Sequence, residues 1–328
     1  MDTNNETPRM AENPATNADS GNVVWSPIKS MWYLSHLMIG TIGGIIFFSW
    51  SAFSLFIVFT ALTLCLGHSL GMHRRLIHNS YECPKWMEYL FVHLGVLVGM
   101  AGPFSMVYQH DIRDWAQRKS ECHPFLRHGS SFFKDGWWQL NCDLRLNNPP
   151  KFIPEMRIRN NKIYRFMERT WMFQQLPWTV LFFYIGGISW VIWGISARIA
   201  ISVTGHWLIG YFAHNEGSRD WHINGAAVQG HNVRFAGLIT MGESWHNNHH
   251  AYPGSAMLGI YQGQNDPGWW VLNALNNLGL VWNIRLPKDL SNRSELQKIH
   301  HEGVTIRNYK LPKPCKFISM VGKVMPPG

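Results

Sequence analysis

Two pairs of long apolar segments constrain the fold of this 328-residue chain more than any other feature. The first pair covers residues 31–48 and 52–72, and the second covers 176–195 and 198–213. A helix needs about 20 apolar residues to cross a bilayer, and all but the short last segment come close to that length. Because only a few residues separate the members of each pair, each pair predicts a helical hairpin. The sequence therefore predicts an all-α membrane protein with four transmembrane helices.

The polar segments around the hairpins complete the predicted domain organisation. Residues 1–24 are rich in Asn, Thr, Asp and Pro and are expected to be disordered. Residues 25–285 form one membrane domain, in which 73–170 and 214–285 make a helical cap. Residues 286–328 form a basic tail.

Lysine and arginine predict the orientation of the chain in the membrane. Residues 73–169 hold 15 of the 29 basic side chains, and the C-terminal part is also basic, whereas the short hairpin turns hold almost none. Because basic residues favour the cytoplasmic side, we expect both termini and the cap to be cytoplasmic. The formal charge of +9 is not accompanied by a nucleic-acid motif. We therefore expect attraction to anionic lipid rather than binding of nucleic acid.

The densest group of histidines lies in G-E-S-W-H-N-N-H-H-A-Y-P, residues 242–253. It contains His246, His249 and His250, which share one face of a helix because residues three and four apart are neighbours. Histidine is the commonest metal ligand in proteins. His246 and His250 are spaced to chelate one ion, which leaves His249 for a second ion.

Further histidines lie at the ends of the apolar segments, on the side expected to be cytoplasmic. His73 and His78 follow the second segment, His110 follows a weaker apolar stretch, and His206 lies in the fourth segment. His73 and His78 are five residues apart and are predicted to straddle two ions. Sites made of imidazoles suit Fe, Zn, Cu or Ni, and seven histidines exceed the four ligands of one tetrahedral zinc. The pattern therefore favours two transition metals.

These motifs resemble those of the integral-membrane fatty acid desaturases, with the acyl-CoA Δ9 desaturases as the closest branch. The resemblance rests on H-R-R-L-I-H at 73–78, on the motif at 242–253 and on the paired hairpins, and it covers roughly residues 30–285. In that family two irons are bound by histidine boxes of the form HxxxxH, HxxHH and HxxHH, and by a further histidine at the end of the fourth span. The resemblance implies these ligands here: His73, His78, His110, His206, His246, His249 and His250.

The second box departs from the family pattern, because it reads H-D-I-R-D from His110 onwards. Arg113 and Asp114 stand where the family has its last two histidines. Asp114 lies four residues after His110, on the same helical face, and is a candidate carboxylate ligand. Alternatively, His123, His128 or His231 supplies the missing ligand, or Arg113 and Asp114 pair with each other or with neighbours and bind no metal. The outcomes left open are a mixed histidine–carboxylate centre, a single metal, or an inactive relative.

The fourth span also departs from the pattern. The family commonly has an Asn four residues before the additional ligand, holding a metal-bound water, whereas Ser202 stands four residues before His206. About eleven extra residues separate His206 from the third box. The histidines interpreted as surface, hydrogen-bonded or otherwise non-ligating side chains are His68, His214, His222 and His231.

By this resemblance, the chain introduces a double bond into a long acyl chain, carried by CoA or a lipid, using O2 and two electrons at two irons. No haem or iron–sulfur motif is visible, so we expect an external donor: a ferredoxin, a rubredoxin, or a b-type cytochrome with its reductase. One alternative is a hydroxylase or other oxygenase acting on a lipid chain, and another is a non-catalytic lipid-binding relative. The basic residues considered for the phosphates of CoA are Arg74, Arg75, Arg118 and Lys119.

Overall fold

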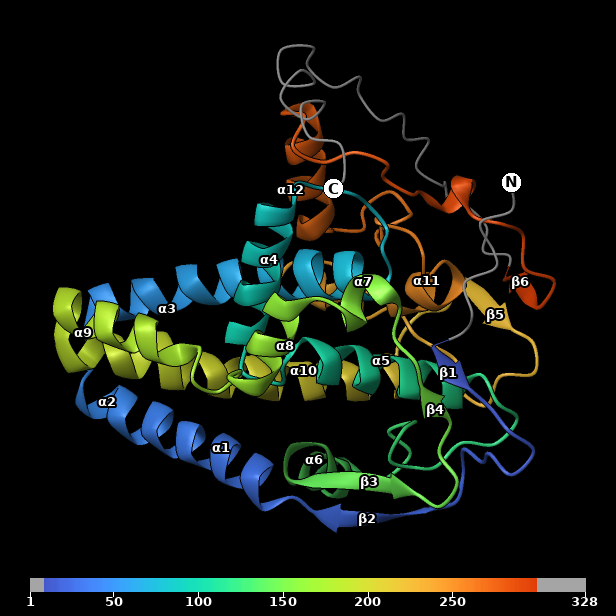
Figure 1. Cartoon of the computed structure of the whole chain (residues 1–328), viewed down its shortest axis with the longest axis horizontal. Helices are drawn as coiled ribbons and strands as arrows, with labels where there is room; N and C mark the ends of the chain where they lie inside the picture. The colour runs from blue at the N-terminus through green and yellow to red at the C-terminus, as the bar shows by residue number, and fades with distance from the viewer. Residues whose placement is uncertain (1–8, 300–328) are drawn as a thin grey trace.

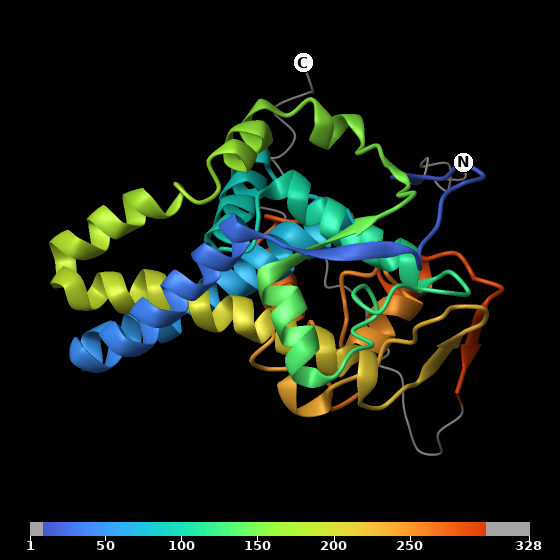
Figure 2. The ribbon, with the colours of Figure 1, turned by 90° about the horizontal axis from the view of Figure 1, so that it is seen from below.

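Two helical hairpins extend from the same side of the molecule in the computed structural model, which describes residues 9–299 (Figures 1 and 2). The outgoing arm of the first hairpin consists of α1 (Pro27–Met38), the π-helix η1 (Ile39–Gly43) and α2 (Gly44–Ile46). Its returning arm consists of α3 (Trp50–Leu62) and the π-helix η2 (Thr63–Ile77). The second hairpin is made of α9 (Gln175–Val191), the π-helix η3 (Ile192–Ala197) and α10 (Arg198–Asn215).

The first hairpin turns where the sequence predicted it, at Ser49. The Ser49 hydroxyl accepts a hydrogen bond from the backbone N–H of Ala52 at 3.2 Å, which caps the start of α3. From Trp50 to Ile77 the helix then runs for 28 residues and is long and apolar enough to cross a membrane. The continuous stretch Gln175–Asn215 meets the same criterion.

The second hairpin turns at Gly187, not between 195 and 198 as predicted from the sequence. Gly187 has φ 64° and ψ −159°, a conformation that glycine adopts without steric cost. Arg198, which suggested a boundary, lies buried inside the helix, where its Nε donates to the Gly194 carbonyl at 2.8 Å. Its Nη2 donates to Oε1 of Gln175 at 2.7 Å, so the buried guanidinium ties α10 to the start of α9.

Close backbone contact fixes η2 against α4 (Lys85–Leu97). A Cβ at Gly71 would lie 2.5 Å from the carbonyl group of Phe91, and a Cβ at Gly67 would collide with the backbone of Leu94. Small residues at such crossings allow helices to approach closely. The glycines therefore set the position of η2, which carries the first histidine box.

The cap, defined here as residues 78–174 and 216–299, lies at the end of the molecule opposite the hairpin turns (Figure 1). Besides α4, its longer helices are α5 (Pro103–Gln117), α6 (Phe132–Asn141), α8 (Lys162–Arg169), α11 (His246–Ala251) and α12 (Pro267–Asn277). Its single-turn helices are α7 (Met156–Arg159), η4 (Arg234–Ala236) and η5 (Pro287–Asp289).

Three short antiparallel sheets correct the prediction of an all-α chain. They pair β1 (Met10–Ala11) with β4 (Lys151–Phe152), β2 (Gly21–Trp25) with β3 (Cys142–Leu146), and β5 (Trp221–Ile223) with β6 (Leu296–Lys298). The expected disorder of residues 1–24 is therefore wrong for residues 9–24, and residues 296–298 of the predicted tail pair with β5. Residues 1–8 and 300–328 lie outside the described part of the chain.

Buried ion pairs hold η2 within the cap. The Nη2 of Arg74 lies 2.7 Å from Oδ1 of Asp266, and the Nη2 of Arg75 lies 2.6 Å from Oε2 of Glu88. Both arginines are buried, with 1% and 7% of their surface exposed. Burial requires such charges to be paired. The suggestion that Arg74 and Arg75 meet the phosphates of CoA is therefore wrong.

Candidate metal centre

Four histidines from three parts of the chain form one cluster at the end of η2. His73 lies near the end of η2, and His78 directly follows this helix. His110 comes from α5, and His249 comes from α11. Their ligand atoms all lie within 4.8 Å of one another. The Nε2 atom of His78 lies 3.2 Å from the Nε2 atoms of both His73 and His110.

The π-helical winding of η2 explains why His73 and His78 share this cluster. In an α-helix, residues five apart differ by about 140° around the axis, which led to the prediction that they straddle two ions. In a π-helix the hydrogen bonds instead join residues i and i+5. The N–H of His78 donates to the carbonyl of His73 at 3.0 Å, so the two side chains follow each other by about one turn. The straddling prediction is therefore wrong.

Carboxylates on the outer side of this cluster fix how two of its rings are protonated. Oε2 of Glu243 lies 2.6 Å from Nδ1 of His73, and Oδ1 of Asp111 lies 3.2 Å from Nδ1 of His110. Because an ionised carboxylate only accepts hydrogen bonds, each Nδ1 carries a proton and each Nε2 presents a lone pair to the cluster. Such carboxylate–histidine pairs orient metal ligands in many proteins.

The donor set of the four-histidine cluster fits a metal ion. The Nε2 of His78 faces two Nε2 lone pairs, from His73 and His110, and carries at most one hydrogen to donate. Among the described residues, neither ring nitrogen of His249 has a hydrogen-bond partner, although both are buried. Buried polar atoms are normally paired. A cation held by these nitrogens satisfies all of them.

A second cluster contains three histidines, His214 from the end of α10 and His246 and His250 from α11. The Nε2 of His246 lies 3.1 Å from that of His214 and 2.9 Å from that of His250. Nδ1 of His214 lies 2.7 Å from the carbonyl oxygen of Gly210. Since a carbonyl only accepts, this Nδ1 carries the proton and the His214 Nε2 offers a lone pair.

The two clusters lie next to each other, because α11 contributes to both. The ring centroid of His249 is 5.7 Å from that of His246 and 5.9 Å from that of His250. Burial lowers the pKa of His250 to about 4 and the pKa values of His246 and His249 well below the ordinary value. These imidazoles are therefore neutral at physiological pH, which is the form that binds metals.

Comparison with known proteins identifies the family, although no protein-family model matches the chain. The sn-1 stearoyl-lipid 9-desaturase of Anabaena variabilis is 32% identical over 244 residues, covering 73% of this chain and 86% of that protein. The acyl-CoA 5-desaturase of Anemone leveillei is 30% identical over 250 residues, 75% of each chain. The Δ9 acyl-lipid desaturase 1 of Arabidopsis thaliana is 30% identical over 232 residues, 70% of this chain and 73% of that one.

The chain belongs to the fatty acyl desaturase family. It is therefore classed as an oxidoreductase, as the resemblance of its histidine motifs implied. Six of the histidines that the sequence assigned to this desaturase's metal centre meet in the two clusters: His73, His78, His110, His246, His249 and His250.

The structure does not bring the seventh predicted histidine, His206, into either cluster. The His206 ring instead meets His68 edge to face, with 5.1 Å between centroids. Two helical turns later, His214 takes a place in the three-histidine cluster, where the sequence suggested only a non-ligating side chain. The interval between His206 and the third box is longer than in the family, and counting from His214 shortens it by eight residues. This interval was the signal that could have identified His214 as the ligand.

Asp114 lies beside both clusters without belonging to either set of ligand atoms. It follows His110 by one turn of α5, and its Oδ2 lies 3.8 Å from Nη2 of Arg118. Burial raises the pKa of Asp114, but its interactions with His110 and Arg118, and with His250 once that ring is protonated in acid, outweigh burial and hold this pKa well below its usual range. Asp114 is therefore an ionised carboxylate at the edge of the centre.

Arg113, the other residue that departs from the second-box pattern, belongs to a separate hydrogen-bond network. Arg113 does not pair with Asp114; its Nη1 donates to Nε2 of His128 at 2.9 Å. Nδ1 of His128 in turn lies 2.8 Å from Oδ2 of Asp135, and the His128 ring stacks on His214 with 5.3 Å between centroids. Neither His128 nor His123, whose Nδ1 accepts from the N–H of Phe125, joins a cluster.

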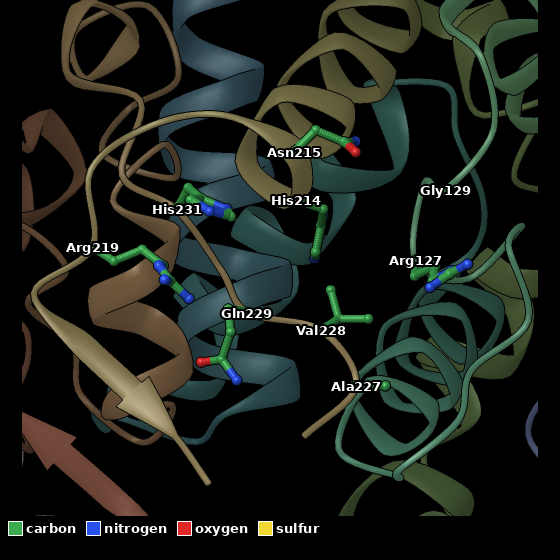
Figure 3. Close-up of a pocket in the computed structure, with 9 residues that line it drawn as sticks. All are labelled: Arg127, Gly129, His214, Asn215, Arg219, Ala227, Val228, Gln229 and His231. Carbon is green, nitrogen blue, oxygen red and sulfur yellow. The ribbon is translucent and has the colours of Figure 1, made fainter. Parts of the chain in front are cut away.

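A pocket of about 330 Å³ opens beside the three-histidine cluster (Figure 3). Figure 3 shows His214 in the middle of the ring made by the other lining residues, among them Arg219, Val228 and His231. His231, which the sequence left open as either a non-ligating side chain or a replacement for the missing ligand, lines this pocket and lies outside both clusters. The pocket connects the surroundings of the three-histidine cluster with the surface of the cap.

Proposed function

We propose that this desaturase crosses the membrane four times, with both termini in the cytoplasm, and introduces a double bond into a long acyl chain. Two hairpins with large exposed apolar side chains support a membrane location. Ile45, Trp50 and Tyr184 are 81%, 75% and 84% exposed, and lipid is the environment in which such surfaces are stable. The relatives named above act on acyl-CoA or acyl-lipid, and we assign this chemical class of substrate to the chain.

The observation that carries the proposal is the pair of adjacent histidine clusters. We assign one iron to the four-histidine cluster and a second iron to the three-histidine cluster, with Asp114 at its edge. When bound, the two irons supply oxygen activation. In the balanced reaction a CH2–CH2 unit loses two hydrogens, and these with two electrons and two protons reduce O2 to two waters. The electrons come from an external ferredoxin, rubredoxin or b-type cytochrome with its reductase.

The role of the protein is to hold and orient the histidine side chains that bind the metal ions. Glu243 and Asp111 keep the protons of His73 and His110 on Nδ1, so that both Nε2 atoms stay directed into the centre. The Ser69 hydroxyl donates to Oε1 of Glu243 at 2.6 Å and fixes this carboxylate in turn. Rigid positioning of this kind keeps the metal-binding nitrogens in a fixed geometry for a bound substrate.

Product analysis tests the proposal. The full chain is reconstituted with iron in lipid vesicles, supplied with a ferredoxin and its reductase, and given stearoyl-CoA or a stearoyl lipid. We expect an acyl product lighter by two hydrogens, absent with His246→Ala and retained with His222→Ala. A product that gains oxygen would instead support the hydroxylase alternative. Failure to turn over any lipid, together with failure to bind iron, would contradict the enzyme assignment.

A further inference from the structure

The three-histidine cluster faces a fourth acceptor atom, which belongs to Gln117. This residue ends α5 and is 1% exposed. Its Oε1 lies 3.1 Å from Nε2 of His214. Gln117 follows His110 by seven residues and Asp114 by three, a spacing that places all three on one face of α5. The side chain therefore enters the centre from the helix that carries the altered second box.

Without a bound cation, the amide of Gln117 meets another acceptor in either of its two orientations. Its Nε2 donates to the carbonyl oxygen of Leu126 at 2.8 Å. Because a carbonyl cannot donate, turning the amide over would place two acceptors against each other at this point. In the observed orientation Oε1 faces His214 instead, and this is the contact that a cation bound at the cluster can relieve.

The contact between Gln117 and His214 joins two acceptors. The proton of His214 is on Nδ1, which faces the Gly210 carbonyl at 2.7 Å, so its Nε2 has a lone pair. That lone pair faces both Oε1 of Gln117 and Nε2 of His246, each 3.1 Å away. His214 and Gln117 are only 8% and 1% exposed, so solvent screens their repulsion poorly. A cation bound among these atoms relieves it.

We propose that the amide oxygen of Gln117 is the fourth donor to the metal ion of the three-histidine cluster, which becomes a site of three nitrogens and one oxygen. The inference rests on the proposed dimetal centre and deepens it. In the second box Arg113 is turned away towards His128, so this position gives no ligand. Gln117, two turns after His110 on the same face of α5, replaces the ligand that is missing from the second box.

Metal titration of the purified full chain in detergent tests this role. Apo protein is titrated with Fe2+ without oxygen, bound iron per chain is measured by mass spectrometry, and affinities are measured against a competing chelator. We expect Gln117→Leu to keep the ion at the four-histidine cluster and to bind the second ion at least tenfold more weakly. Gln117→Glu, which restores an oxygen, should bind two ions. Gln174→Leu is the control, because the Gln174 amide donates to the Thr170 hydroxyl at 2.7 Å and belongs to neither cluster.

The outcomes separate this inference from the proposed function. Two ions in the wild-type protein, with unchanged affinity in Gln117→Leu, would overturn the role of Gln117 and leave the dimetal centre intact. If Gln117→Leu loses both ions through misfolding, Gln117→Glu decides, since loss of the second ion there would also overturn the role. Fewer than two ions in the wild-type protein would overturn the dimetal centre and the role of Gln117 together.

Discussion

The Nε2 atom of His214 lies 3.1 Å from the Nε2 atom of His246, although 32 residues separate them in the sequence. His214 comes from the end of the second apolar hairpin, and His246 begins α11 in the cap. The three-histidine cluster therefore joins the two parts of the molecule. A metal bound there stabilises their contact, because a ligand that binds only the folded state shifts the folding equilibrium.

Replacing His214 or His206, both in α10, tests which of the two is a metal ligand. We expect His214→Ala to lose one of two bound irons, since its Nε2 lies in the three-histidine cluster. His206→Ala should keep both irons, because His206 contacts His68 instead. Iron per chain measures the difference, and the reverse pattern would show that the ligand is His206.

Removal of the Glu243 charge should weaken the four-histidine cluster. Glu243→Gln leaves an uncharged amide oxygen, a weaker acceptor than the carboxylate, for the Nδ1 proton of His73, and mutation of such a partner typically reduces metal affinity about 10–100-fold. Chelator competition measures this affinity. Glu295→Gln, at a surface ion pair with Arg293, is the control and should leave the affinity unchanged. Equal affinities in both variants would remove Glu243 from the account.

Gly71 and Gly205 provide a matched pair for helix packing. Gly71→Ala places a methyl group against the backbone of Phe91, and such overpacking typically destabilises a protein by about 1–3 kcal/mol. A Cβ at Gly205 would have no heavy atom of the described residues within 4 Å. Gly205→Ala should therefore leave the free energy of unfolding unchanged or raise it by up to about 1 kcal/mol. Thermal unfolding in detergent compares them. A Gly71→Ala protein as stable as wild type would contradict the close crossing of η2 and α4.

The metal-free protein should lose stability in acid. Burial lowers the pKa of His250 to about 4, and burial together with Arg113 does the same for His128. An unfolded histidine titrates near pH 6.5, so the unfolded state takes up these protons first as the pH falls. Stability should therefore fall between about pH 6.5 and pH 4, with a smaller slope in His128→Gln. A melting temperature that is constant over this range would contradict the neutral state of these rings.

Local sequence patterns predicted the elements whose geometry is local. Ser49 identified the first hairpin turn, and the spacing of His246, His249 and His250 predicted that they would project together from α11. The turn at Gly187 was missed because the apolar run continues through it. The sequence instead placed the boundary before the charged residue Arg198. Its burial inside the helix depends on the tertiary contact with Gln175, which the sequence does not reveal.

The features that the sequence did not reveal depend on contacts between distant residues or on unusual winding. His214 joins the centre only because α10 extends to Asn215 and meets α11. The placement of His73 with His78 needs a π-helix, whereas the prediction used α-helical angles. The short strands likewise depend on partners more than 70 residues away, such as Val23 opposite Leu144.

The measurement that tests the central claim most directly is iron per chain in the wild-type protein, in His78→Ala and in His246→Ala. Each variant removes one ligand from a different cluster. The account predicts two irons in the wild-type protein and one in each variant, retained at the other cluster. Less than one iron in the wild-type protein, or two in both variants, would contradict a dimetal centre built from these two histidine clusters.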